Sequence, residues 1–293
     1  MKLAFVAGER KHARMTIQCP AVSSLQSQRV AGVGALSVAQ SQGRTRLVRL
    51  REEGAAKIRL PKGRREGLEA VLINTAGGLT GGDRLRWDIQ AEASSTLTVT
   101  TQACERAYRS AGGDTAVTTR ITVAEGASLA WLPQETILYD RSALRRSLDI
   151  SVAPGAWALI VEPIILGRKA HGETVELAEF RDCWRVHDCE RLVHAEAFAL
   201  GPHVAGQMAR PVFGNGARAF ATALLIGDGS ELLLQPLRDI IGAHGGASYW
   251  QVGRTGKLLA RLIAEDGYAL RSRLVPALQL LNGQAPLPKL WSL

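Results

Sequence analysis

Three stretches of this sequence repeat one pattern, and the repeat restricts the folds open to the chain more than any other feature. Ile89 to Gln102, Ile121 to Gln134 and Ile150 to Pro163 can be aligned at offsets of 32 and 29 residues. Each stretch begins with a β-branched residue, turns through small residues and continues into an apolar strand. A regular repeat with no helix between the strands is typical of stacked hairpins or of a solenoid-like β structure, in which each unit buries its apolar face on the next.

Alternation of side chains within the repeats also indicates strands. Val117, Thr119, Ile121 and Val123 alternate with polar residues, which gives a period of two with one apolar face. We therefore predict a mainly β protein of stacked β-hairpins, either β-helix-like or a two-layer sheet. Because the three copies are only loosely alike, a plain β-sandwich of successive hairpins is an alternative.

The chain outside the repeats divides into simple parts. We expect residues 1–28 to be a mobile N-terminal extension and residues 29–293 to form one domain, β-rich over 29–200 and α+β over 201–293. Short strands with turns at 42–43 and 52–54 are expected between Arg29 and Arg59. Further on, the pattern predicts a hairpin over Phe180–Ala199, strands at Ala219–Ile226, Ser248–Val252 and Lys257–Ala264, and helices at Ser230–Ile241 and Tyr268–Leu281.

A glycine-rich connection lies just before the first repeat. Two double glycines fall within six positions, followed by Asp83, and glycine adopts positive φ without a steric penalty. As local structure we expect a hairpin turn between Val71–Asn74 and Arg84–Ile89. The alternative is a phosphate cradle, but the paired glycines match neither the dinucleotide-binding nor the Walker spacing. The four glycines are Gly77, Gly78, Gly81 and Gly82.

The positive charge of the chain is concentrated at one end. The net charge is +9, and the first 70 residues hold 14 Lys and Arg against 5 Asp and Glu, whereas the remainder holds 22 of each. A basic run between Arg44 and Arg65 suggests either an acidic partner protein or a nucleic-acid backbone. Aromatic residues are nearly absent from this run, so the stacking platforms of a single-strand binder are missing. We favour a basic face that docks on an acidic protein, and we keep a basic β-rich nucleic-acid-binding module as the alternative.

Cysteine usage and hydropathy bear on the compartment. The four cysteines contain no CxxC pair, so neither a disulfide scaffold nor a zinc ribbon is indicated, and a reducing compartment fits best. Leu3 to Ala7 is too short for a signal-peptide core, and no apolar run approaches the length that spans a membrane. We expect a cytoplasmic protein without a membrane partner.

Soft metal ligands gather in one short segment. Cys183, His187, Cys189 and His194 lie within a dozen residues, but their spacing matches no zinc finger. We interpret them as two small buried cysteines and two surface histidines. The sequence also has no HExxH, GxSxG or Walker motif and no cysteine with an obvious base partner, so no self-contained catalytic apparatus is visible in it.

Four carboxylates stand at strand-like positions beside large apolar residues. They serve either ordinary turns and ion pairs, or a cation or an interface, and a hydrolase with paired carboxylates including Glu135 is a further alternative. Glu162 lies inside the apolar run Trp157–Leu166, where a carboxylate must be paired or solvated through an internal opening. The four are Asp83, Glu135, Asp140 and Glu162.

Four ordered motifs give the sequence a specific resemblance. Residues 72–83, 97–103, 107–110 and 131–137, continued by Glu162 and residues 166–168, resemble the urease accessory protein UreD family, also called UreH. Many members have Pro-Pro where this chain has Thr75-Ala76. The positions that carry the resemblance include Gly77, Gly78, Gly81, Gly82, Gln102, Tyr108, Arg109, Gln134, Gly167 and Arg168.

The resemblance implies a cytoplasmic scaffold without enzymatic activity. Members of the family bind apo-urease and the accessory protein UreF, which recruits the GTPase UreG, and together they deliver nickel to urease through a protein with an internal passage. Nickel would then be a transient cargo, and no nucleotide or nucleic acid would bind this chain. We hypothesise that oxygen ligands such as Asp83, Glu135, Asp140 and Glu162 bind the ion weakly enough to release it.

Overall fold

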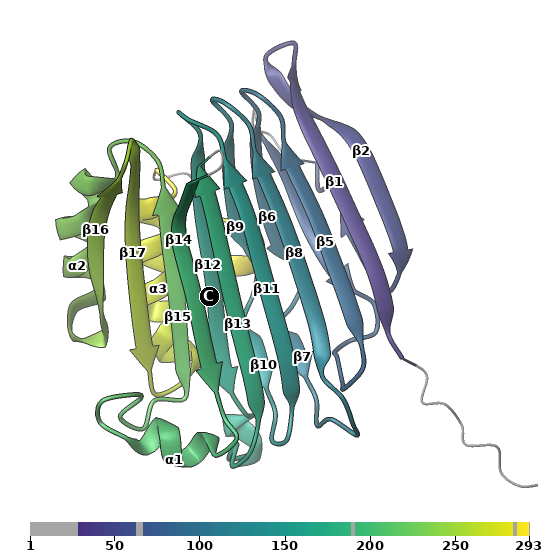
Figure 1. The fold of residues 1–293 in the computed structure, drawn as a ribbon, viewed down its shortest axis with the longest axis vertical. Coiled ribbons are helices and arrows are strands. Elements are labelled where there is room, and N and C mark those ends of the chain that lie inside the picture. The colour runs from purple at the N-terminus through teal and green to yellow at the C-terminus, as the bar shows by residue number, and fades with distance from the viewer. Residues whose placement is uncertain (1–28, 63–66, 189–190, 284–285, 293) are drawn as a thin grey trace, which may run out of the picture.

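Two β-sheets packed face to face form the body of the protein (Figure 1). The computed structural model describes residues 29–62, 67–188, 191–283 and 286–292. The extension expected at residues 1–28 and the side chain of Cys189 lie outside the described residues. The mainly β fold predicted from the repeat is confirmed, with helices towards the C-terminus.

The first sheet has seven strands in the order β14-β13-β11-β8-β5-β1-β2. Their bounds are β1 Ala31–Ser41, β2 Arg44–Gly54, β5 Arg84–Ala91, β8 Thr115–Val123, β11 Ala143–Val152, β13 Glu179–Asp188 and β14 Arg191–Leu200. The five central strands, from β1 to β13, run parallel, and β2 and β14 are antiparallel edge strands.

The second sheet has ten strands, eight of them in the order β16-β17-β15-β12-β9-β6-β4-β3, with β7 and β10 attached beside β12. Their bounds are β3 Ala56–Arg59, β4 Leu68–Asn74, β6 Thr96–Thr101, β7 Glu105–Ala107, β9 Ser128–Leu132, β10 Thr136–Leu138, β12 Trp157–Leu166, β15 Ala219–Ile226, β16 Gly245–Val252 and β17 Thr255–Ala264. The strands expected in the C-terminal part are thus confirmed, β16 starting earlier than predicted.

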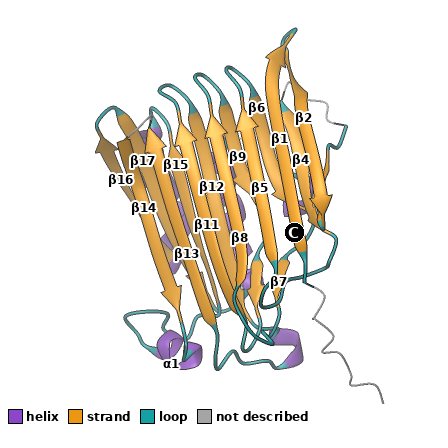
Figure 2. Cartoon of the chain, turned by 45° about the vertical axis from the view of Figure 1, so that its right-hand side comes forward, coloured by secondary structure: helices purple, strands orange, loops and turns teal. Residues whose placement is uncertain are grey.

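Each sequence repeat forms one coil that crosses from the first sheet to the second. The turns at 92–95, 124–127 and 153–156 join β5 to β6, β8 to β9 and β11 to β12, and they line one end of the sandwich (Figure 2). The two strands of a repeat therefore do not pair with each other as a hairpin. Each pairs in parallel with its equivalent in the next repeat, which makes the structure solenoid-like.

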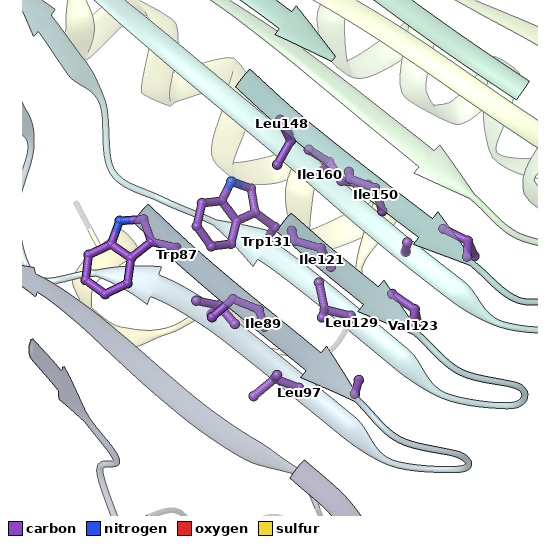
Figure 3. Close-up of a cluster of buried hydrophobic side chains, with 14 of the residues drawn as sticks. Trp87, Ile89, Leu97, Ile121, Val123, Leu129, Trp131, Leu148, Ile150 and Ile160 are labelled. Carbon is purple, nitrogen blue, oxygen red and sulfur yellow. The ribbon is translucent and has the colours of Figure 1, made fainter. Parts of the chain in front are cut away.

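Residues that the repeat aligns in the sequence are the residues that pair across neighbouring strands in the structure. Ile89 pairs with Ile121, 32 residues later, and Ile121 pairs with Ile150, 29 residues later. In the facing sheet, Leu97 pairs with Leu129 in the same way. These side chains point into the space between the sheets and pack there as rows (Figure 3). Burial of these aliphatic rows, at about 1.5–3 kcal/mol per side chain, holds the two sheets together.

One glycine permits a close approach within this core. The six-membered ring of Trp87 lies against the backbone of Gly34 on the neighbouring strand, and a Cβ on Gly34 would come within 2.2 Å of the Trp87 ring. Because the indole fills the space that any larger side chain would need, this position admits only glycine without repacking.

Helices cover the outer face of the second sheet. They are α2 Leu234–Ile241, preceded by a 3₁₀ turn over Ser230–Leu233, and α3 Gly267–Leu281, which Asp266 caps by accepting a hydrogen bond from the Ala269 amide at 2.9 Å. Both match the predicted helices. A short helix, α1 Val204–Ala209, was not expected. No helix among the described residues is long and apolar enough to cross a membrane.

The glycine-rich connection does not form the hairpin turn predicted for it. β4, which precedes it, belongs to the second sheet, whereas β5, which follows it, belongs to the first. The connection therefore changes sheets. Gly77 and Gly82 have positive φ values of 75° and 89°, which the crossing requires.

Candidate functional site

An arginine from the first sheet binds two buried carboxylates between the sheets. Arg146 of β11 donates from Nε to Oδ1 of Asp182 on β13 at 3.1 Å, and its two terminal nitrogens donate to Asp182 and to Glu162 of β12. The three residues are each 6–8% exposed. We call Arg146, Glu162 and Asp182 the inter-sheet ion cluster.

Two further side chains complete the hydrogen bonding of the cluster. The indole Nε1 of Trp131 donates to Glu162 at 2.8 Å, and Arg146 donates to the hydroxyl of Thr136 at 3.3 Å. Of the two alternatives given for Glu162, paired or solvated through an internal opening, the structure shows the first. Burial raises the pKa of Glu162 to about 7, although the Arg146 charge acts in the opposite direction.

A polar row continues from the cluster towards the glycine-rich connection. Thr136 pairs in register with Glu105 of β7, so their side chains lie on the same face of the second sheet. Asn74 donates to both carboxylate oxygens of Glu105 at 3.2 Å, and also to the carbonyl of Gly78 at 3.4 Å. Burial raises the pKa of Glu105 to about 7 as well. We call Asn74, Glu105, Thr136 and the inter-sheet ion cluster the polar row.

A third buried carboxylate pairs with an arginine of helix α3. Arg271 donates to Glu135 at 2.6 and 3.0 Å and also bonds the side chain of Gln134. Burial alone would raise the pKa of Glu135, but the Arg271 hydrogen bonds and charge outweigh it, and the pKa is lowered. The thiol of Cys104 donates to Glu135 at 3.4 Å, and burial, with the Glu135 charge, raises the thiol pKa to about 11. At neutral pH this sulfur is a protonated thiol and a poor metal ligand.

The other two predicted carboxylates hold the backbone of turns. Asp83 accepts hydrogen bonds from the amides of Val30 and Thr80, both at 2.8 Å. Asp140 accepts from two successive amides, at positions 176 and 177, at 2.9 and 3.0 Å. These bonds account for both side chains structurally.

The four carboxylates do not converge on one metal centre. Within the ranges that the structure describes, no group of three or more His, Cys, Asp or Glu side chains could hold a metal ion. Their role as weak transit sites for a cation stays a prediction: Asp83 and Asp140 accept hydrogen bonds from backbone amides, and Glu162 and Glu135 are each paired with an arginine.

Several motif positions that are far apart in the sequence meet at one end of the sandwich. The Tyr108 ring lies so close to Gly78 that a Cβ there would come within 2.2 Å of it. Tyr108 also contacts Tyr139 edge-on at 5.1 Å, and the guanidinium of Arg168 lies over the Tyr139 ring at 4.5 Å. Gly167, which precedes Arg168, has a positive φ of 68°.

Two other motif residues contribute through their backbones. The amide of Gln102 donates to the carbonyl of Leu72 at 2.9 Å, and the carbonyl of Arg109 accepts from the hydroxyl of Thr80 at 2.8 Å. The Gln102 bond ties strand β4 to the first repeat, and the Arg109 bond ties the glycine-rich connection to the segment that follows β7.

Sequence reasoning missed the partners of the named carboxylates. Arg146 follows Leu144 and precedes Leu148 on the buried face of one strand, and Asp182 lies between Phe180 and Trp184 on the next. A charged residue at an inward-facing position of an alternating strand is the signal that would have found both. Arg271 has no such signal, because its contact with Glu135 joins residues 136 positions apart.

The interpretation of the cysteine and histidine segment needs two corrections. Cys183 is exposed rather than buried, because it lies on the outward face of β13. His194 is buried rather than on the surface, since it pairs in register with Val186, which faces the core. Burial, together with the charges of Lys257 and Arg261, lowers the pKa of His194 to about 4.

Comparison with known proteins gives one consistent result. The family model described as UreD urease accessory protein matches residues 31–292. "Urease accessory protein UreD" of Mesorhizobium japonicum is 52% identical over 278 residues, which cover 95% of this chain and 99% of that protein. "Urease accessory protein UreD 1" of Brucella abortus biovar 1 is 51% identical over 272 residues, covering 93% and 97%. The protein of that name in Brucella anthropi is 52% identical over 283 residues, covering 95% and 100%.

Proposed function

This chain belongs to the UreD family of urease accessory proteins, and we propose that it is a scaffold for the insertion of nickel into apo-urease, without a reaction of its own. The observation that carries the proposal is the length of the match, which includes both sheets and the C-terminal helices. At about half identical residues over nearly the whole chain, the same fold and the same buried side chains are expected in the relatives.

We propose that the scaffold acts in the cytoplasm within a larger assembly. In this proposal it binds apo-urease and UreF, and UreF recruits the GTPase UreG. The sequence supports this division of labour, because the glycine-rich connection lacks the Walker spacing and no nucleotide motif is found elsewhere. The energy for release of the ion would come from the partner GTPase.

We propose that nickel is handled by carboxylates of the polar row. Burial raises the pKa of both Glu162 and Glu105, so their carboxylates are less firmly held in the charged form than solvated ones. Oxygen ligands hold a borderline cation less tightly than thiolates do, and the raised pKa of Cys104 keeps that nearby sulfur protonated. Weak binding suits an ion that must move on to urease.

Co-expression tests the function directly. A urease operon that lacks its own copy of this gene is expressed in nickel-containing medium with the wild-type chain or with Glu162→Gln. As the matched control, Asp149→Asn removes an exposed carboxylate from the outward face of the neighbouring strand β11. We expect ureolysis with the wild type and the control, and reduced ureolysis with Glu162→Gln. Equal ureolysis with and without the chain would contradict the proposal.

A further inference from the structure

We propose that the open edge of β2 is the docking site for an extended, acidic segment of a partner protein, which adds a strand to the first sheet. This inference rests on the proposed function, because the partner is taken from the urease maturation assembly. β2 is the last strand of its sheet, and no strand among the described residues pairs with its second edge (Figure 1). Its 11 residues leave a row of backbone donors and acceptors free to pair.

In the middle of the side of β2 that faces the sandwich, two apolar side chains remain exposed. Leu50 pairs in register with Leu36 and Leu47 with Val38, and both partners on β1 are buried in the core. Leu47 and Leu50 are nevertheless each 41% exposed. β3, the last strand of the second sheet, has only four residues and meets β2 at Glu52, which accepts a hydrogen bond from the Ile58 amide; nearer the other end of β2, Thr45 accepts from the Thr96 amide. Leu47 and Leu50 lie between these two contacts and stay open to solvent.

The opposite side of β2 is basic. Arg46, Arg49 and Arg51 pair in register with Ala39, Ser37 and Ala35, and so lie on the outward face of the sheet. Arg51 is engaged by Glu53, but no carboxylate among the described residues pairs with Arg46 or Arg49. The strand thus presents arginines on one face and leucines on the other along an open edge. Val48, which is 62% exposed, lies at the register shift between Leu47 and Arg49.

This pattern specifies the occupant. A strand added to β2 would place acidic side chains beside Arg46 and Arg49 on one face, and apolar side chains beside Leu47 and Leu50 on the other. A second copy of the same strand would instead bring arginine next to arginine, which is unfavourable. Nucleic acid would use the arginines but leave the leucines exposed, and β2 has no aromatic side chain on which a base could stack.

Binding of purified apo-urease and purified UreF to the full chain tests the inference. The test variant is Arg46→Glu with Arg49→Glu, and a milder variant carries glutamine at both positions. The matched control is Arg120→Glu with Arg181→Glu, which reverses two exposed arginines on the outward face of the same sheet but away from its edge. We expect one of the two probes to bind the test variant about tenfold or more weakly than the wild type, the glutamine variant to be intermediate, and the control to be unchanged.

Hydrogen exchange gives a readout that charge alone would not produce. We expect the amides of residues 44–54 to gain protection when that probe binds, because strand addition hydrogen-bonds the open edge. Unchanged affinity of both probes for the test variant, with no added protection in β2, overturns the inference while leaving the proposed function intact. If the wild type binds neither probe and does not support ureolysis, the proposed function fails, and the inference fails with it.

Two other occupants are distinguished in the same experiment. A wild-type dimer that becomes a monomer in the test variant would assign the edge to self-association. A salt-dependent shift of labelled RNA or DNA that disappears in the test variant, with apo-urease and UreF still bound, would assign it to nucleic acid. Either result overturns the acidic-segment proposal.

Discussion

Replacement of Arg146 by methionine should destabilise the protein more than any change at a surface ion pair. The guanidinium hydrogen-bonds Asp182 and Glu162 between the sheets, where all three residues are at most 8% exposed. Methionine is similar in length but leaves two carboxylates buried without a cation. Removal of one partner from a buried ion pair costs about 3–5 kcal/mol, a large part of the roughly 5–15 kcal/mol that stabilises a domain.

The cost should depend on pH in a defined direction. In the wild type, burial already raises the pKa of Glu162 from 4.5 to about 7. The Arg146 charge works against this rise, so without Arg146 the folded protein holds a proton on Glu162 still more tightly than the unfolded chain does. A raised folded pKa favours the folded state at low pH, and this advantage is lost as the pH rises through it. The deficit of the variant should therefore be small near pH 5 and largest near pH 8.

Urea unfolding followed by far-UV circular dichroism measures this deficit at both pH values. The matched control is Arg145→Met, which removes the neighbouring arginine on the outward face of β11, where it pairs with Asp114 and is 57% exposed. A surface pair of this kind is worth about 0–1 kcal/mol. A loss for Arg146→Met no greater than that of the control, or a deficit that shrinks as the pH rises, would refute the reasoning.

Three further outcomes are expected. Glu162→Gln keeps an acceptor for the indole of Trp131 but cannot titrate. As the pH rises from about 4.5 to 7, the free energy of unfolding should therefore fall less in this variant than in the wild type. The same pH profile in variant and wild type would show that Glu162 does not titrate in this range. Gly34→Ala should cost about 1–3 kcal/mol in urea unfolding, whereas Gly246→Ala, where nothing lies within 4 Å, should not; equal stabilities would contradict the packing. In a variant with serine at positions 19 and 189, a maleimide should label exposed Cys183 faster than Cys104, whose pKa is about 11; equal rates would contradict that burial.

Much of the fold follows from local sequence patterns. The registers that join Ile89, Ile121 and Ile150 are the offsets of the repeat, so the stacking of strands could be predicted from the sequence. The sequence could not show that the two strands of one repeat lie in different sheets rather than pairing as a hairpin. A turn of four residues closes a hairpin or crosses between two sheets with similar residue types, and only the packing of Trp87 and its neighbours between the sheets decides between them.

The candidate site was predictable only in part. Glu162 stands out because it is a carboxylate inside an apolar strand, whereas its partner Arg146 comes from a strand of the other sheet. Asp83 and Asp140 looked similar in the sequence, yet both accept hydrogen bonds from backbone amides: Asp83 from Thr80 in its own turn, and Asp140 from two amides 36 and 37 residues further along the chain. Distinguishing these two classes requires the tertiary structure.

The nickel content of urease tests the central claim most directly. Urease is purified from cells that express its operon with the wild-type chain, with Glu162→Gln or without the chain, and nickel per active site is measured by mass spectrometry. The proposed function predicts near-complete occupancy with the wild type, a reduced value with the variant and the lowest value without the chain. Equal nickel content in urease from cells with and without the chain would contradict it.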